Sequence, residues 1–179
     1  MWFSKLLLRI AGWTVNITVP DYPKAIICVA PHTSNWDFVL GKLAYASAGR
    51  KAGFLMKESW FFFPLGLIFK AMGGIPVPRR RGSSLVDEIV KKFNASERMA
   101  LAITPEGTRS RTANWRSGFL HIAMQANVPI VLGAIDAATK RIIIERTFTP
   151  SGNVEADMRA IKDYYKPFTG LHPELFTTD

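Results

Sequence analysis

The sequence predicts an α/β fold: a single domain with a mostly parallel or mixed sheet flanked by helices, preceded by an N-terminal amphipathic helix. Short apolar runs alternate along the chain with segments of helical period, which is the pattern of strand–helix units. The 179 residues suffice for one sizeable core, and no repeat, low-complexity tract or linker divides them. We therefore expect a helix within residues 1–13 and one domain over residues 14–179.

Residues 2–13 have the spacing of an amphipathic helix. One face carries Trp2, Phe3, Leu6, Leu7, Ile10 and Trp13, and the other carries Ser4, Lys5, Arg9 and Gly12, with Leu8 as an exception. Aromatic residues at both ends of an apolar face, with cations beside it, are typical of a helix that lies in a membrane interface. The alternative is that this face packs on the domain, and the sequence favours neither.

The next elements lead to the first functional motif. Residues 14–19 alternate between apolar and polar and predict a strand, and the apolar run 25–30 predicts a buried strand. Ser34 or Asn35 can cap a helix that runs to about Ala48. An apolar stretch over 57–74 is expected to be a helical or irregular connection.

The remaining elements continue the alternation. Short apolar runs bounded by turn residues predict the other strands, at 53–56, 75–77, 99–103, 130–135 and 141–148. Helical periodicity predicts the other helices, at 84–95, 116–127 and 153–165. The helix at 84–95 begins with a capping-box-like pair, Ser84 and Asp87.

Two polar motifs follow predicted strands. His32 and Asp37 come after the strand at 25–30, and the string Glu106-Gly107-Thr108-Arg109 comes after the strand at 99–103. Ligands in such sheets bind beyond the carboxyl ends of strands. We therefore expect both motifs at one edge of the sheet.

The residue types of the first motif suit general-base chemistry. A neutral imidazole is available near pH 7, and a carboxylate on its other nitrogen would fix the tautomer and stabilise the imidazolium. Asp37 can serve His32 in this way if the chain turns into a helix between them. The alternative is a helix-capping loop in which His32 packs against Trp36.

The second motif suits phosphate binding. Arg109 can grip a phosphate with two parallel hydrogen bonds. Glu106 can accept from a polyol hydroxyl or hold Arg109, and an internal Glu–Arg pair that shapes the loop is the alternative. Arg79 follows an extended segment and is expected to point into the site, while Arg80 and Arg81 meet anionic lipid; the alternative is a solvated basic patch.

Four blocks together resemble the glycerolipid acyltransferase family, whose bacterial type is the 1-acylglycerol-3-phosphate acyltransferase. They occur in the order of that family, at His32–Asp37, Gly73–Arg79, Pro105–Ser110 and Val128–Val131. The resemblance covers roughly residues 25–135. Pro31, Thr104 and Leu132 depart from the common pattern and bear on the acceptor. Lysophosphatidate, which would give phosphatidate, is the default acceptor, and another lysolipid or an aminoacyl lipid precursor is the alternative.

The resemblance implies transfer of an acyl chain from acyl-CoA or acyl carrier protein to a hydroxyl of a lysolipid. His32 would be the general base and Asp37 would orient it. Arg79 and Arg109 would bind the acceptor's phosphate, while Glu106, Gly107 and Thr108 would shape the acceptor site. The acyl thioester is a co-substrate, and we expect no other cofactor.

The formal charge of +9 favours anionic partners. We expect an anionic phospholipid membrane and no nucleic acid, because no nucleic-acid motif accompanies the charge. No metal site is expected, because the three histidines and one cysteine lack ligand spacing. No segment has the apolar length of a membrane-spanning helix, so we expect peripheral attachment to the cytoplasmic face of the membrane. A non-catalytic lipid-binding domain is the competing hypothesis.

Overall fold

The predicted α/β fold is confirmed in a computed structural model, which describes residues 1–77 and 84–179. Within these residues the helices are α1 (Trp2–Ile10), α2 (Asn35–Ser47), α3 (Leu65–Ala71), α4 (Leu85–Ala95), α5 (Gly118–Ala126) and α6 (Val154–Tyr165). The strands are β1 (Thr14–Ile17), β2 (Lys24–Ala30), β3 (Gly53–Lys57), β4 (Gly74–Val77), β5 (Met99–Ile103), β6 (Ile130–Asp136) and β7 (Arg141–Phe148).

One mixed sheet organises the described residues. Its seven strands lie in the order β1-β7-β6-β2-β5-β3-β4. The pairing of β6 with β7 is antiparallel, and the other neighbours run parallel. The central strands β2, β5 and β6 therefore present their carboxyl ends at one edge, as the sequence predicts for the two motifs.

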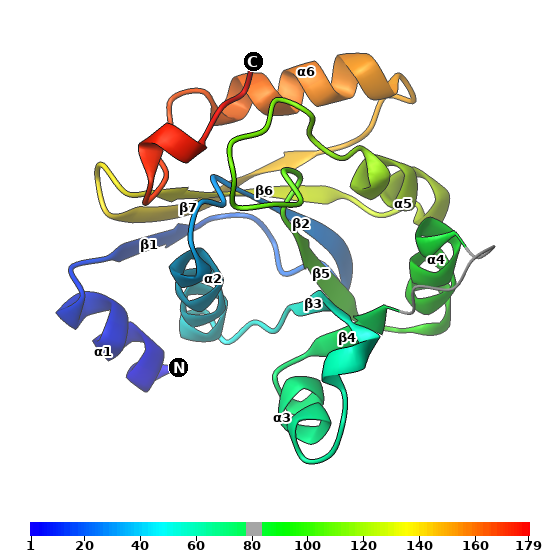
Figure 1. Cartoon of the computed structure of the whole chain (residues 1–179), viewed down its shortest axis with the longest axis horizontal. Coiled ribbons are helices and arrows are strands. Elements are labelled where there is room, and N and C mark those ends of the chain that lie inside the picture. Colours follow the sequence, from blue (N-terminus) through cyan, green and yellow to red (C-terminus); the bar gives the residue numbers. More distant parts are fainter. Residues whose placement is uncertain (78–83) are drawn as a thin grey trace.

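Helices cover both faces of the sheet (Figure 1). Helices α1 and α2 lie on one face, where Leu8, Leu40 and Ala44 pack on strand residues such as Ile27. Helices α4, α5 and α6 cover the other face. Strands β2 and β6 are apolar on both sides because a covered parallel sheet removes both faces from water.

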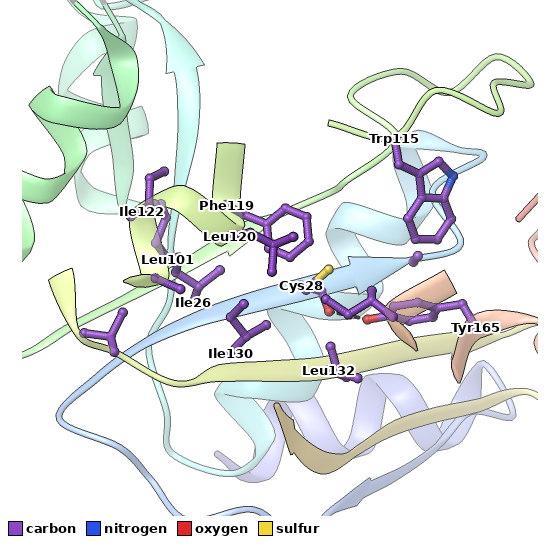
Figure 2. Close-up of a cluster of buried hydrophobic side chains, with 14 of the residues drawn as sticks. Ile26, Cys28, Leu101, Trp115, Phe119, Leu120, Ile122, Ile130, Leu132 and Tyr165 are labelled. Carbon is purple, nitrogen blue, oxygen red and sulfur yellow. Dashed lines mark hydrogen bonds between the residues drawn. The ribbon is translucent and has the colours of Figure 1, made fainter. Parts of the chain in front are cut away.

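The core beneath α5 and α6 is the larger of the two (Figure 2). Phe119 and Leu120 of α5 lie over Ile26 of β2, and all three are buried. The Tyr165 hydroxyl at the end of α6 donates to the Cys28 carbonyl oxygen at 2.6 Å. This bond fastens α6 to β2 close to the point where β2 delivers His32.

The N-terminal helix is shorter than predicted and turns its apolar face outward. It ends at Ile10 rather than residue 13. Trp2 and Ile10 are 73% and 74% exposed, whereas Ser4 and Leu8 are buried. The packing of α1 on the domain therefore runs through the residues expected on its polar side. Of the residues predicted on the apolar face, only Trp13, which follows the helix, packs on the domain. The others are exposed, so the alternative that the apolar face of the helix packs on the domain is wrong.

The apolar connection over 57–74 folds into a short 3₁₀ turn, Glu58–Trp60, and α3. Much of it is exposed: Phe63 is 84% exposed and Leu67 is 62% exposed. Gly66 permits the tight turn, because a Cβ there would lie 2.6 Å from the Phe61 carbonyl oxygen. In the described part of the chain, no helix is long and apolar enough to span a bilayer.

Candidate active site

The two polar motifs meet at one edge of the sheet. Strands β2 and β5 are parallel neighbours, with Cys28 beside Ile103. The chain leaves both strands in the same direction, and the backbone N–H of His32 donates to Glu106 Oε1 at 3.0 Å. The expectation that both motifs share an edge is confirmed by this contact.

His32 and Asp37 face one another across the start of α2. His32 Nδ1 lies 3.4 Å from Asp37 Oδ2, and the side chains are 19% and 2% exposed. Nδ1 is buried. Nε2 is therefore the ring nitrogen that does not face the carboxylate.

A helix cap explains the spacing of this pair. Ser34 is the N-cap of α2, and its Oγ accepts from the Trp36 N–H at 3.2 Å. Asp37 Oδ2 accepts from the backbone N–H groups of Thr33 and Ser34 at 2.7 and 2.8 Å. The carboxylate in the first helical turn thus reaches back over the cap, which brings it to the imidazole. Trp36 is 67% exposed, so His32 does not pack in a core against it.

Glu106 is buried beside this pair. Burial raises the pKa of Glu106 to about 7, opposed by the hydrogen bond from the His32 N–H and by the nearby imidazole. Its Oε2 atom is buried and has no hydrogen-bond partner among residues 1–77 and 84–179. No ion pair joins it to Arg109 within the described residues.

Arg109 is brought to the same site by a different contact. Its Nη1 donates to the Asn35 side-chain oxygen at the start of α2. Gly107 has a φ of +64°, and a Cβ there would lie 3.2 Å from Arg116 Cγ, so the loop requires glycine at this position. Thr108 Oγ1 accepts from the Ser110 N–H at 3.2 Å and shapes the turn before Ser110. The prediction for Arg79 lies outside the described residues.

A cavity of about 500 Å³ opens beside the pair and extends beneath α2. Its walls are mainly apolar side chains of α2 and the sheet, including Ile27, Phe38, Phe54, Ile135 and Ile142. Gly41 also lines it, and a Cβ there would meet no atom within 4 Å. Farther along α2, Lys42 Nζ donates to the carbonyl oxygens of Ala52 and Met72 at 3.1 and 2.7 Å.

Two features of the site were missed in the sequence. Asn35, seen there only as a possible cap, is the partner of Arg109. Thr33 is 3% exposed and holds Asp37 through its N–H. Both follow from the capped start of α2. The side chain of Arg116, which follows the Glu106 loop in the sequence, lies against Gly107. Among the described residues no cluster of three His, Cys, Asp or Glu side chains could hold a metal ion.

Comparisons with known proteins point to one family. A family model described as Acyltransferase matches residues 15–135. A 1-acyl-sn-glycerol-3-phosphate acyltransferase of Cocos nucifera is 31% identical over 83 residues, which are 43% of this chain and 27% of that protein. A 1-acyl-sn-glycerol-3-phosphate acyltransferase of Escherichia coli (strain K12) is 26% identical over 127 residues, 67% of this chain and 50% of that protein. The chain thus spans half or less of the length of these relatives.

A solved structure shares the fold. The 1-acyl-sn-glycerophosphate acyltransferase PlsC from Thermotoga maritima superposes with a TM-score of 0.62 at 18% identity. The match covers 92% of this chain and 76% of that protein. The overall fold of this chain is therefore a known architecture.

Proposed function

This chain belongs to the Acyltransferase family, and from that premise we propose that it moves a fatty acyl chain from a thioester to the hydroxyl of a lysolipid. The acceptor that its relatives' names suggest is 1-acylglycerol-3-phosphate, with phosphatidate as the product. Acyl-CoA and acylated carrier protein both supply the required thioester. The acyl thioester is the co-substrate, and the proposed reaction uses no further cofactor.

The observation that carries the proposal is the position of the His32–Asp37 pair. The His32 side chain lines an apolar cavity, and Asn35, the hydrogen-bond partner of the cationic Arg109, lines the same cavity. An acyl-transfer site needs these three parts: a base, an apolar compartment for the chain and a cation for the acceptor's phosphate. Glu106, Gly107 and Thr108 form the loop between the base and Arg109.

The proposed reaction transfers the acyl group directly from sulfur to oxygen. His32 Nε2 takes the proton of the acceptor hydroxyl as its oxygen attacks the thioester carbonyl carbon. Asp37, facing Nδ1 at 3.4 Å, stabilises the imidazolium that forms. The tetrahedral intermediate collapses, the carbon–sulfur bond breaks, and the leaving thiolate receives the proton from the imidazolium. The products are an ester and a free thiol.

The cavity beneath α2 is proposed to hold the acyl chain. Its lining is apolar, and transfer of apolar surface out of water stabilises binding by about 25 cal/mol per Å². Gly41→Leu would add a side chain inside it without a clash at Cβ. We expect this variant to lose activity with palmitoyl donors and to keep it with octanoyl donors. Gly118→Leu is the matched control, because a Cβ at Gly118 also meets open space.

Peripheral attachment to an anionic membrane is part of the proposal. The outward face of α1 and the exposed apolar side chains near α3 give two apolar surfaces beside cations such as Lys5 and Lys70. Phe3→Asp with Ile10→Asp changes only exposed side chains and is expected to weaken binding to anionic vesicles at any salt concentration. Binding by the variant equal to wild type would contradict insertion of α1. The corresponding cellular site is the cytoplasmic face of the membrane.

The experiment that tests the function is an acyl-transfer assay on purified protein with vesicles. Palmitoyl-CoA and palmitoyl carrier protein are each offered with a panel of lysolipids. Transfer to lysophosphatidate that disappears in His32→Ala and persists in His121→Ala would support the enzyme and its base. Transfer to another lysolipid alone would change the acceptor and keep the reaction. Vesicle binding with no transfer to any acceptor would overturn the proposal in favour of a lipid-binding domain.

A further inference from the structure

The segment that follows α6, residues 166–179, runs across both loops of the site; we call it the strap. It contacts the sheet first at the end of β6: the Thr169 N–H donates to Asp136 Oδ1 at 3.0 Å, and the Ala137 N–H donates to the Thr169 carbonyl oxygen at 2.8 Å. Asp136 ends β6 and is buried. The strap therefore begins from a fixed point at the sheet edge that carries the site.

The strap next contacts the His32 loop. The His172 N–H donates to Thr33 Oγ1 at 3.0 Å. Gly170 approaches the same residue so closely that a Cβ there would lie 2.8 Å from Thr33 Cγ2 and 3.2 Å from Pro31 Cβ. Since Thr33 is 3% exposed, the strap closes this side of the loop.

The strap then contacts the loop that follows Glu106. Trp115 Nε1 donates to the Thr177 carbonyl oxygen at 3.2 Å, and the Trp115 and Phe176 rings lie 6.1 Å apart. Lys162 Nζ donates to the carbonyl oxygens of Ala113 and Asp179 at 2.9 and 3.2 Å. One continuous segment thus holds the loops that carry His32 and Glu106.

Thr33 links the strap to the reacting pair. Its hydroxyl accepts from the strap, and its N–H donates at 2.7 Å to Asp37 Oδ2, the oxygen that faces His32. We propose that the strap is part of the active-site framework and that Thr33 is the positioning residue through which it sets the His32–Asp37 geometry. The inference rests on the proposed acyl transfer for its effect on rate, and on geometry alone for its effect on the loop.

The test combines two variants that disturb the same contact from opposite sides. Thr33→Val keeps the branched shape and removes the acceptor, and Gly170→Ala places a methyl group against Thr33. Each is expected to lower kcat about tenfold while KM for donor and acceptor stays within about twofold, because the pair is misplaced and substrate contacts are not. Thr33→Ser keeps the hydroxyl and is expected to restore most of the rate. Gly118→Ala is the control.

Amide hydrogen exchange gives a readout that does not depend on activity. Exchange at the Thr33 and Ser34 amides, which donate to Asp37, is expected to quicken about tenfold in Thr33→Val and Gly170→Ala. Exchange at Ile89 and Phe93 in the distant core of α4 should not change. If the wild-type protein shows no acyl transfer, the proposed function is refuted. Amide exchange alone would then decide whether the strap holds the His32 loop.

Three results would overturn the inference. Unchanged exchange at Thr33 and Ser34 in both variants would show that the strap does not hold the loop. Faster exchange with an unchanged kcat would show that the held geometry does not serve the reaction. A rate in Thr33→Ser as low as in Thr33→Val would show that packing, and not the hydroxyl, is what matters.

Discussion

The proposed base side and the proposed acceptor side of the site are built differently. His32, Asp37 and Glu106 are largely buried. The backbone N–H groups of the His32 loop donate to the carboxylates of Glu106 and Asp37. Arg109 and Thr108 lie exposed on a loop, and the bond from Arg109 to Asn35 is the contact that places the guanidinium. The groups proposed to transfer the proton are thus held by the fold, whereas the groups proposed to bind phosphate lie on an exposed loop. The predictions below separate the two halves by their effects on kcat and KM.

The largest effect is expected on the base side. Asp37→Asn should lower kcat on the order of 10³-fold with little change in KM, because an amide neither fixes the tautomer nor stabilises the imidazolium. Steady-state kinetics on vesicles measures this. Asp157→Asn is the matched control, because Asp157 is equally buried but lies outside the site. Its carboxylate accepts from the Ser151 hydroxyl at 2.7 Å and from the Ser151 N–H at 2.9 Å. A wild-type kcat in Asp37→Asn would contradict the expectation that changes on the base side lower kcat and changes on the acceptor side raise KM.

A smaller effect of another kind is expected on the acceptor side. Arg109→Ala should raise KM for lysophosphatidate about 10- to 100-fold, because it removes a charge-assisted contact to a phosphate. Arg109→Lys should recover part of the loss, since it keeps the charge without the fork geometry. Arg111→Ala, on the same exposed loop, is the control. A change confined to kcat would place Arg109 with the base instead.

The pH dependence of stability tests how deeply the base side is buried. The pKa of Glu106 is raised to about 7, so between its ordinary value and pH 7 the folded state binds more protons than the unfolded state. The free energy of unfolding should therefore fall as pH rises through this window, by about 3 kcal/mol in total from this residue. Glu106→Gln should remove that part of the slope in urea unfolding between pH 5 and 8. An identical dependence of the unfolding free energy on pH in wild type and Glu106→Gln would count against the burial of Glu106. Glu174→Gln is the control, because Glu174 is exposed.

The smallest effect is expected where the two halves touch. Asn35→Ala removes the partner of Arg109 but keeps Ser34 as the cap of α2. KM for the acceptor should rise about threefold and kcat should stay unchanged, as expected for the loss of one hydrogen bond. A fall in kcat would mean that the acceptor loop also orders the base. The double variant with Arg109→Ala should be no worse than Arg109→Ala alone.

The sequence predicted the parts of the site that depend on local rules. His32 and Glu106 each follow a buried run, and parallel neighbours must deliver them to the same edge. The capped start of α2 likewise predicts that Asp37 turns back toward His32. The bond from the His32 N–H to Glu106 depends instead on the register of β2 against β5. No periodicity within one segment encodes that register.

The same limit applies to the surface. The apolar period of residues 2–13 predicts a helix, but which face meets the domain depends on α2, whose position is set by the sheet. Leu8, the exception to the pattern, proved to be the buried apolar residue of α1. The contacts of the strap could not be predicted from the sequence, because they join residues far apart in the chain: Thr33 with His172, and Trp115 with Thr177.

One oxygen, Asp37 Oδ2, both accepts hydrogen bonds at the capped start of α2 and faces the His32 imidazole. Replacement of Asp37 would therefore have two separate costs, the loss of its hydrogen bonds at the start of α2 and the loss of its contact with His32. A descendant with no remaining use for acyl transfer would still lose about 1 kcal/mol of stability on losing the cap. The aspartate can therefore outlive the reaction, while nothing in the helix requires the imidazole. When members of this family are sorted into enzymes and inactive relatives, the histidine is the more informative residue of the two.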